Sequence, residues 1–246
     1  MELLRGKAAI VTGASRGIGL GIACALAREG ADLVVHATRE EHLEPVRAQA
    51  ERWGVRCVTA AGDVAQPETA RLLTQIALER LGRLDIAVSC AGVNQDGMLH
   101  RLSDEAWERV LAVNLSGVFY LTRSAAQVMR AQRSGRIINI SSVARNGNLG
   151  QSNYAAAKAG VAALTQTAAL ELGPFGVTCN TVCPGFIDTD MTRGVPDAAR
   201  ERMLSRIPAR RSGRPEEVGD AVAFLASDRA AYINGQTLDV SGGLIL

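Results

Sequence analysis

The stretch that decides the fold is residues 8–19, which read AAIVTGASRGIG. Its first four residues form a continuous apolar run, which predicts a strand buried on both faces. Glycines follow at positions 13, 17 and 19, and residues 17–28 carry the apolar periodicity of a helix. Glycines let a backbone turn tightly against a pyrophosphate, and a helix N-terminus offers free N–H groups to it. The stretch predicts a dinucleotide-binding turn, with a tight turn that binds nothing as the alternative.

The same alternation of short apolar runs and longer amphipathic segments continues to the end of the chain. The runs predict strands at residues 32–35, 56–60, 84–89, 136–140, 177–182 and 237–240. The segments between them predict helices at residues 41–53, 67–81, 103–130, 153–172 and 215–225. This pattern predicts an α/β protein: one doubly wound Rossmann domain, residues 1–246, whose seven-stranded parallel sheet has helices on both faces.

Residues 185–214 interrupt this rhythm, with two prolines, several charges and only one short helical pattern. We expect this segment to be an insertion over the carboxyl edge of the sheet, where such folds bind ligands. It is therefore interpreted as a substrate lid.

Composition excludes several classes of function. The 27 basic and 25 acidic residues give a net charge of +2, which offers no argument for a nucleic-acid or membrane partner. The sequence shows neither a cleavable leader nor a run of about 20 apolar residues, so we expect a cytoplasmic protein. The five cysteines are scattered, and Cys179 and Cys183 have no histidine nearby to complete a metal site. No metal is expected.

The residues after the second predicted strand bear on the choice of cofactor. A site that prefers NAD would normally place an acid there to bind the ribose 2′-hydroxyl. This chain has Thr38 and Arg39 instead, and Arg16 lies in the glycine turn. Both arginines could face a 2′-phosphate, which favours NADPH, although a solvated surface position is the alternative for each.

Two further loops are expected to close over the cofactor. Asp63 and Val64 follow the third predicted strand, and Cys90, Ala91 and Gly92 follow the fourth. Capping of a turn is the alternative for Asp63.

Tyr154 and Lys158 are four residues apart in a helical segment rich in alanine, so they share one helical face. A lysine ammonium, and a cationic nicotinamide, would favour the phenolate of a tyrosine that otherwise titrates near pH 10. Tyr154 could then exchange a proton with a carbonyl or alcohol oxygen.

Three more polar residues could complete this chemistry. Ser141 and Ser142 follow the fifth predicted strand, where a hydroxyl could hold the substrate oxygen. Asn114 is an isolated amide among apolar residues of the long helix, and we expect a water chain towards Lys158 to satisfy it.

Over essentially its whole length the chain resembles the short-chain dehydrogenase/reductase family, and within it the 3-oxoacyl-[acyl-carrier-protein] reductases. The resemblance rests on residues 12–19, 114–119, 150–158, 184–191, 224–227 and 241–243. It implies a catalytic tetrad of Asn114, Ser142, Tyr154 and Lys158. It also implies NADPH as the reductant and a homotetramer built partly on two long helices. Its cofactor-binding residues would be Gly13, Ser15, Arg16, Gly17, Ile18, Gly19, Thr38, Arg39, Asp63, Val64, Cys90, Ala91, Gly92, Tyr154, Lys158, Pro184, Gly185, Ile187 and Thr189.

The chain departs from the family pattern in three places. Where the family has Asn-Asn-Ala-Gly, residues 89–92 read Ser-Cys-Ala-Gly, and a thiol cannot replace the amide's hydrogen bonds. The loop between the serines and Tyr154 is one residue shorter than in the family. Alignment from the fifth predicted strand therefore selects Ser142 as the catalytic serine, whereas counting back from Tyr154 selects Ser141. In the family, basic residues near the active-site mouth bind the acyl carrier protein. Arg133 is present in this chain, but Phe175 stands where a second basic residue is often found.

The leading hypothesis is NADPH-dependent reduction of a 3-oxoacyl thioester, bound to acyl carrier protein or CoA, in fatty-acid or polyketide-like biosynthesis. A lid cluster, defined as Arg206, Arg210, Arg211 and Arg214, could meet an acidic carrier, or be a solvated face. One alternative is a reductase or dehydrogenase of another ketone or alcohol. An alternative of another class is a non-catalytic NADP-binding sensor or structural subunit. A dimer is the alternative to the tetramer.

Overall fold

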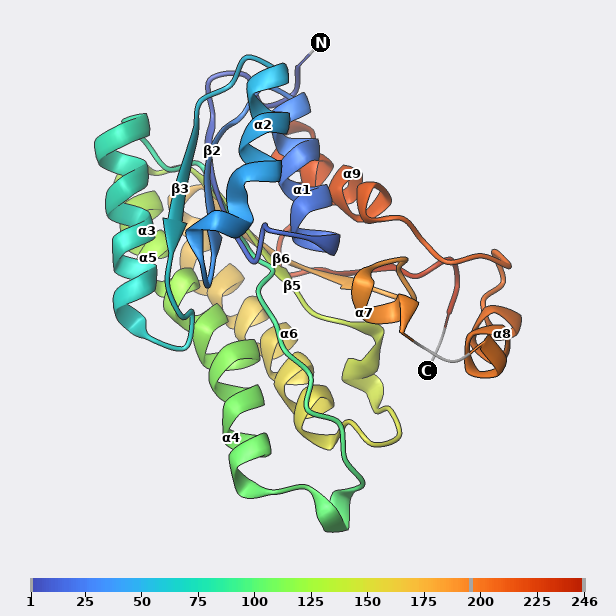
Figure 1. The fold of residues 1–246 in the computed structure, drawn as a ribbon. Helices are drawn as coiled ribbons and strands as arrows, with labels where there is room; N and C mark the ends of the chain where they lie inside the picture. The colour runs from blue at the N-terminus through green and yellow to red at the C-terminus, as the bar shows by residue number, and fades with distance from the viewer. Residues whose placement is uncertain (1, 195–196, 245–246) are drawn as a thin grey trace.

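The computed structural model describes residues 2–194 and 197–244. Its centre is a seven-stranded sheet in the order β3-β2-β1-β4-β5-β6-β7, with every neighbouring pair parallel (Figure 1). The strands are β1 (Ala8–Thr12), β2 (Asp32–Ala37), β3 (Cys57–Ala61), β4 (Ile86–Ser89), β5 (Gly135–Ile140), β6 (Val177–Pro184) and β7 (Thr237–Val240). The chain reverses its direction of winding between β1 and β4, and such a switch point forms a ligand crevice at the carboxyl edge. The predicted fold class is confirmed.

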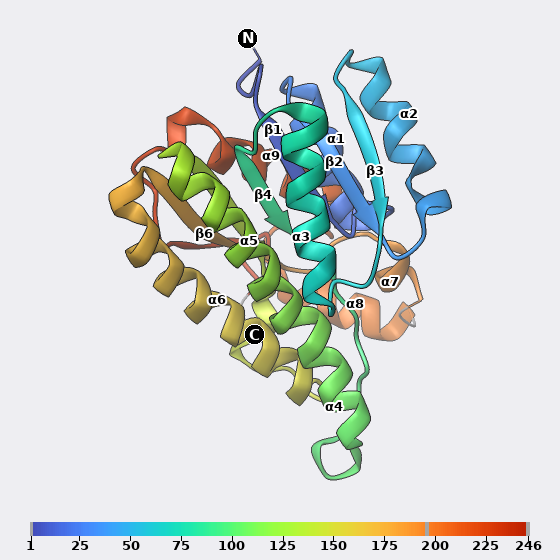
Figure 2. The ribbon, with the colours of Figure 1, turned by 90° about the vertical axis from the view of Figure 1, so that its left-hand side faces the viewer.

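Helices cover both faces of the sheet. They are α1 (Gly17–Arg28), α2 (Glu44–Arg52), α3 (Pro67–Ile76), α4 (Asp104–Leu111), α5 (Gly117–Gln132), α6 (Ser152–Leu172), α7 (Asp190–Arg193), α8 (Asp197–Arg206) and α9 (Pro215–Ala226). Helices α1, α2 and α9 bury their apolar sides against one face. Helices α3, α5 and α6 cover the other, as Figure 2 shows.

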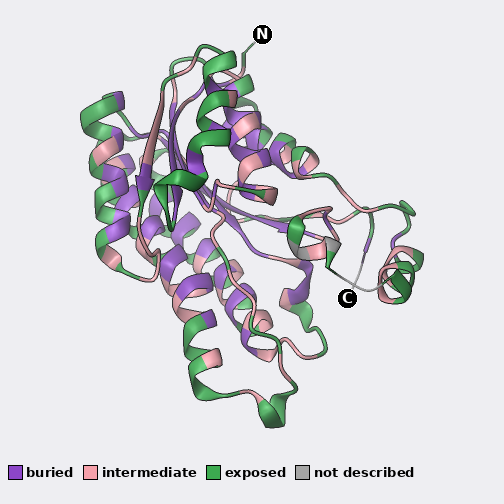
Figure 3. Ribbon diagram, in the orientation of Figure 1, coloured by how far each residue is buried: buried purple, intermediate pink, exposed green. Residues whose placement is uncertain are grey.

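The core lies on the two faces of the sheet, because its central strands are buried along their length. All five residues of β1 and all eight of β6 are buried (Figure 3). Strands buried on both faces need such continuous apolar runs, which is why the runs were visible in the sequence. Within the described ranges, no helix combines the length and apolarity that a bilayer crossing requires.

The long helix predicted at residues 103–130 is interrupted. Ser103 caps its first turn, since its hydroxyl accepts the N–H of Ala106 at 3.2 Å. One wide π turn, Ala112–Ser116, then separates α4 from α5. Asn114 lies in this turn, and such bulges are frequent at functional sites.

The segment predicted as a lid contains more helix than the sequence indicated. Both α7 and α8 lie within residues 185–214, where one short helical pattern was expected; residues 195 and 196 lie outside the described part. Near the two ends of this segment, Asp188 N–H donates to the Gly213 carbonyl at 2.8 Å and Ile187 bridges to Gly213. A helix of four residues, such as α7, is too short to show a periodicity in the sequence.

Candidate active site

The glycine turn after β1 has the geometry that the sequence predicts. Gly13 and Gly17 have φ angles of +68° and +53°, which side-chain-bearing residues rarely adopt. A Cβ at Gly13 would lie 2.7 Å from the Ala91 Cα, and one at Gly19 would overlap the Gly13 carbonyl oxygen. Ile18, in the first turn of α1, packs against the core, and Ser15 is half-buried in the glycine turn. Only glycines fit this path.

The N-terminus of α1 is free to bind an anion. Its N-cap residue, Arg16, has an extended backbone, and among the described residues no side chain caps this helix end and no acid lies in its first turn. Unpaired N–H groups and the helix dipole attract phosphate at such a position. The turn and the helix end therefore fit a pyrophosphate.

Two guanidinium groups stand near this helix end and the end of β2. Arg16 is exposed, as are Thr38 and Arg39 just after β2. The Arg39 side chain is 71% exposed, and its salt bridge to Glu41 spans 4.0 Å. An exposed pair this long contributes little, so Arg39 can turn to another anion. Arg16, Thr38 and Arg39 together fit the 2′-phosphate of NADPH.

The loop after β3 is held by an ion pair that the sequence did not reveal. The Arg109 guanidinium of α4 donates to Asp63 at 2.8 Å, and the Ala65 N–H donates to the same carboxyl at 3.0 Å. Burial acts to raise the pKa of Asp63, but these two partners outweigh it and lower that pKa. Val64 packs against α5, where a Cβ at Gly117 would lie 3.0 Å from the Val64 carbonyl oxygen. Both residues therefore border the end of β3 in fixed positions.

The loop after β4 is supported although it has Cys90 in place of an asparagine. The Thr12 hydroxyl of β1 accepts the N–H groups of Cys90 and Ala91 at 3.1 and 3.3 Å. Burial raises the pKa of the Cys90 thiol to about 12, so this group is neutral. The link between β1 and this loop therefore does not depend on a side-chain amide at position 90.

Three of the predicted groups meet beside Gly92. A Cβ at Gly92 would lie 3.1 Å from the Asn114 Oδ1 and 3.9 Å from the Lys158 Nζ. The Lys158 Nζ donates to the Ile140 carbonyl at 2.8 Å and lies 5.6 Å from the centre of the Tyr154 ring. The ends of β4 and β5, the π turn and α6 thus converge on one point.

Asn114 is fully buried, and two backbone groups are its partners. Its amide donates to the Val93 carbonyl at 2.8 Å and accepts the Val93 N–H at 2.9 Å. The sequence did not indicate these two backbone partners, and the expected water chain towards Lys158 stays a prediction. The backbone of the β4–α4 loop runs alongside the π turn and supplies both partners.

The structure gives the two serines different neighbours. The buried Ser141 hydroxyl donates to the Lys158 carbonyl at 2.7 Å, so it ties β5 to α6. The Ser142 hydroxyl accepts the Ala144 N–H at 3.1 Å and also hydrogen-bonds Tyr154. Ser142 is therefore the serine that stands beside the phenol.

Burial dominates the protonation of the tyrosine and lysine. It raises the pKa of Tyr154 to about 12; the Ser142 hydrogen bond opposes this, and Cys90, Asp96 and Cys183 reinforce it. Burial also lowers the pKa of Lys158 to about 8. The expectation of a lowered phenol pKa is not met in this structure, because desolvation disfavours the phenolate. The phenol is a protonated acid at neutral pH.

The loop after β6 lies against the glycine turn. Pro184 ends β6, Ile187 is buried, and a Cβ at Gly17 would lie 3.2 Å from the Thr189 Cγ2. Gly185 leaves no room for a side chain, since a Cβ there would lie 2.8 Å from the Ser241 Cα. These residues close the carboxyl edge of the sheet on the side of α7.

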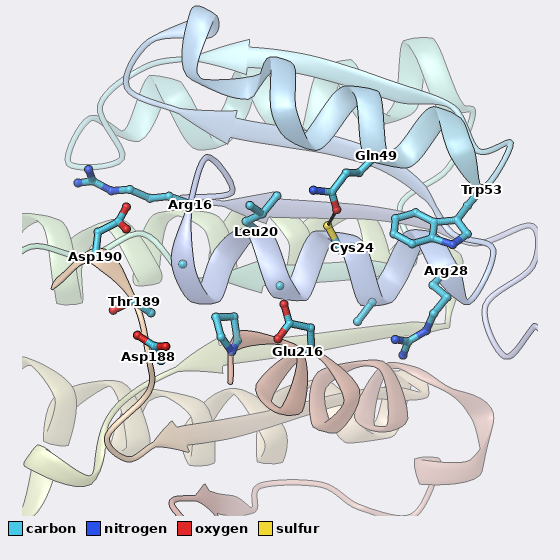
Figure 4. A pocket seen from close by; sticks show the side chains of 14 residues that line it. Arg16, Leu20, Cys24, Arg28, Gln49, Trp53, Asp188, Thr189, Asp190 and Glu216 are labelled. Carbon is cyan, nitrogen blue, oxygen red and sulfur yellow. Dashed lines mark hydrogen bonds between the residues drawn. The ribbon is translucent and has the colours of Figure 1, made fainter. Parts of the chain in front are cut away.

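A cavity of about 420 Å³ runs along the outer side of α1 (Figure 4). It is lined from α1, α2, α9 and the loop after β6, and it meets the predicted residues at Arg16, Gly17 and Thr189. The Cys24 thiol donates to the Gln49 side chain there at 2.8 Å. Burial is the main cause that raises the pKa of Cys24 to about 11. The cavity borders the glycine turn but does not contain Tyr154 or Lys158.

Arg133 does not lie where the sequence analysis placed it. It ends α5 directly before β5 begins, and its guanidinium donates to the Pro174 carbonyl at 3.4 Å. Lys158 contacts the opposite end of β5, roughly 16–20 Å along a six-residue strand. Arg133 and Phe175 therefore lie at the amino edge of the sheet, away from the mouth of this chain's own site.

Comparison with known proteins places this site in a family. A family model described as enoyl-(acyl carrier protein) reductase matches residues 13–245. A 3-oxoacyl-[acyl-carrier-protein] reductase FabG from Vibrio cholerae is 44% identical over 244 residues, 99% of each chain, and its Thermotoga maritima counterpart is 40% identical over the same shares. The solved structure of levodione reductase matches with a TM-score of 0.94 and 31% identity, over 98% of each chain. The predicted resemblance is thereby confirmed: this chain belongs to the short-chain dehydrogenase/reductase family.

Proposed function

We propose that the chain is an oxidoreductase that uses NADPH to reduce a 3-oxoacyl thioester to the 3-hydroxyacyl thioester in fatty-acid biosynthesis. The observation that carries the proposal is the convergence of Ser142, Tyr154, Lys158 and Asn114 at one sheet edge, next to the glycine turn. Relatives that match almost the whole chain bear the name of this activity. Because the phenol is protonated, the site suits proton donation, which is the direction of reduction.

The cofactor would be held along the carboxyl edge. Gly13–Gly19 and the N-terminus of α1 would bind the pyrophosphate, and Arg16, Thr38 and Arg39 the 2′-phosphate. The loops at Asp63–Val64 and Cys90–Gly92, with Pro184, Gly185, Ile187 and Thr189, would enclose the rest. When bound, NADPH supplies the hydride that reduces the ketone carbon.

The tetrad residues would each have one task. The Ser142 hydroxyl holds the ketone oxygen, and the Tyr154 phenol donates its proton to that oxygen as the carbon is reduced. Lys158 is largely an ammonium at neutral pH and stabilises the phenolate that remains. Asn114 fixes Val93, and with it the loop beside Lys158, through two hydrogen bonds.

Two of the four arginines in the lid cluster already have partners within the chain, so fewer of them are available to bind an acidic carrier protein. Arg211 pairs with Glu217 at 2.6 Å, and this partner is the largest cause that lowers the Glu217 pKa to about 2. Arg210 donates to the Ser205 carbonyl at 2.8 Å. Arg206 is exposed on α8, and Arg214 is 72% exposed with only a 3.9 Å ion pair to Glu217, so these two cations of the cluster are the best placed to meet an acidic carrier. Acyl carrier protein or CoA is proposed as the thioester carrier.

We also propose assembly into a homotetramer, with a dimer as the alternative, and a cytoplasmic location. Large apolar side chains are exposed on the helices that cover one face, namely Trp107, Phe119 and Leu170. Others lie near the last strand, namely Tyr232 and Leu238. Exposed apolar groups of this number are typical of surfaces that meet another subunit.

The test is the initial rate of NADPH oxidation with an acetoacetyl thioester, with NADH in parallel. A crotonyl thioester, which has a double bond in place of the ketone, tests the enoyl reduction that the family model's description names. NADPH-dependent turnover of the ketone alone supports the proposal. Turnover of no 3-oxoacyl thioester while NADPH binds would overturn it and direct attention to other ketones and alcohols.

A further inference from the structure

Ser142, the serine proposed to hold the ketone oxygen, lies at the start of a short helical turn, η5 (Val143–Asn146), just after β5. Its hydroxyl accepts the Ala144 N–H at 3.1 Å, and its carbonyl accepts the Arg145 N–H at 3.1 Å. Both bonds join Ser142 to the turn. The position of its hydroxyl therefore depends on how η5 is held against the sheet.

The chain just before Ser142 is held from two sides. The Ser141 N–H donates to the Val182 carbonyl of β6 at 2.8 Å, and the Ser141 hydroxyl donates to the Lys158 carbonyl of α6 at 2.7 Å. The chain after η5 runs over the surface instead, since residues 146–149 are all exposed. A second anchor for Ser142 must therefore come from η5 itself.

The apolar contacts of η5 hold it against the core without fixing its orientation. Val143 is buried in a small cluster with Ile207 and Leu244. Contacts of this kind are non-directional, so a small rotation of the turn would preserve most of them.

Arg145, the third residue of η5, supplies a directional anchor. Its guanidinium donates to both carboxylate oxygens of Asp239 in β7, at 2.8 and 3.2 Å, and also to the Ser142 carbonyl at 3.4 Å. Two parallel bonds between a guanidinium and a carboxylate fix direction as well as distance. The Arg145 side chain is only 18% exposed, so this pair is less screened than an ordinary surface ion pair.

The carboxylate partner is fixed in turn by the sheet. Asp239 stands opposite Cys183 in the parallel pairing of β6 with β7. Cys183 directly follows Val182, whose carbonyl accepts the Ser141 N–H. Ser142 is thus bracketed by two contacts that lead to the same stretch of the sheet, one from each side.

We propose that Arg145 and Asp239 are positioning residues, whose ion pair holds η5 so that the Ser142 hydroxyl faces the ketone oxygen. The proposal rests on the proposed function, in which that hydroxyl holds the substrate. Both residues act through Ser142, and neither is assigned a contact with substrate or cofactor. Such positioning matters for the rate, because a misplacement of about 1 Å in an active site can slow a reaction by about a hundredfold.

The first part of the experiment measures kcat for the acetoacetyl thioester in Arg145→Ala and Asp239→Ala. Each should lose about five- to thirtyfold in kcat, because the serine is displaced but not removed. The KM for NADPH should not change, since neither residue is among those proposed to hold the cofactor. The Asp239 side chain is 43% exposed, so Asp239→Ala tests the pair even if Arg145→Ala does not fold.

The second part separates positioning from a general structural role. Arg145→Ala is combined with Ser142→Ala, and the residual reduction is measured in single turnovers with enzyme in excess. Once the hydroxyl is gone there is nothing left to position, so Arg145→Ala should then cause no further loss. A general structural defect would instead multiply the two losses.

The matched control is another ion pair between a shielded arginine and an exposed aspartate. Arg136 begins the far end of β5 and is 11% exposed, and it pairs with Asp228 at 3.2 Å. Arg136→Ala and Asp228→Ala should leave kcat unchanged.

A wild-type kcat in both Arg145→Ala and Asp239→Ala would overturn the proposal. An equal loss in the control variants, or a further loss of full size in the Ser142→Ala background, would also overturn it. Absence of thioester turnover in the wild type would instead overturn the proposed function, and the same variants would then be compared on the ketone that the protein does reduce.

Discussion

Replacing Lys158 by methionine should abolish reduction and yet make the protein more stable. The lysine side chain is 3% exposed, and its Nζ has one hydrogen bond, to the Ile140 carbonyl at 2.8 Å. A charge in such a place is costly unless it is fully paired. Methionine has a similar length and can fill the same space without a charge.

The size of the effect follows from the pKa of Lys158, which burial lowers from 10.5 to about 8. A shift of this size corresponds to about 3 kcal/mol of cost to the folded state below pH 8. In the variant the Ile140 carbonyl loses its hydrogen bond from Lys158, and this loss lowers the free energy of unfolding by about 1–2 kcal/mol. The net gain is about 1–2 kcal/mol, or roughly 2–8 °C in Tm for a chain of this size.

The stability advantage of Lys158→Met depends on pH, because the cost that it removes depends on the charge of the lysine. Below pH 8 the lysine is charged in both the folded and the unfolded state, so the full cost is present. Between about pH 8 and 10.5 the folded state loses its proton first, and the cost falls. The advantage of Lys158→Met should therefore shrink as pH rises through this window.

The assay is thermal unfolding at pH 7, 9 and 10, with enzyme activity at pH 7. Lys7, the one other lysine in the sequence, is half-buried just before β1, and Lys7→Met is the control; it should show no comparable rise in Tm. A lower Tm for Lys158→Met at pH 7, or an advantage that grows from pH 7 to 10, would refute the reasoning.

Three further predictions concern the cofactor end and the proton. Arg39→Ala should raise the KM for NADPH by about tenfold, because a charged hydrogen bond to the 2′-phosphate is lost, and should leave the KM for NADH unchanged; equal effects on both in initial-rate assays would contradict this role. Gly19→Ala should abolish NADPH binding measured by fluorescence, because its Cβ overlaps the Gly13 carbonyl oxygen, whereas Gly194→Ala, whose Cβ meets no atom within 4 Å, should bind normally. The kcat for reduction should be level below about pH 8 and fall above it as Lys158 loses its proton; a kcat that rises across pH 8 to 10 would exclude Lys158 as the cation that stabilises the phenolate.

The sequence predicts the fold well because the fold depends on local patterns. Continuous apolar runs such as Ala8–Val11 occur where a parallel sheet is covered on both faces, and the structure extends this one only to Thr12. The glycines at 13, 17 and 19 are required by backbone geometry that no other residue satisfies. Periodicity could not reveal both helices of the lid segment, because α7 has only four residues.

The candidate site shows what residue spacing cannot supply. Spacing left Ser141 and Ser142 as alternatives, and only the three-dimensional contacts separate them. The partners of Asn114 depend on a loop that runs beside a π turn, and neither feature has a sequence signal. The protonation of Tyr154 depends on burial, which the sequence indicates for a helix face but not for a single phenol. The Arg145–Asp239 ion pair joins residues 94 positions apart and was not found from the sequence.

The most direct test of the central claim, that the Tyr154 phenol is the acid of a 3-oxoacyl thioester reductase, is the rate of NADPH oxidation by Tyr154→Phe with an acetoacetyl thioester. The account predicts a loss of at least about a hundredfold in kcat, since general acid catalysis contributes roughly that much or more, with NADPH binding unchanged. Turnover close to that of the wild type would contradict it.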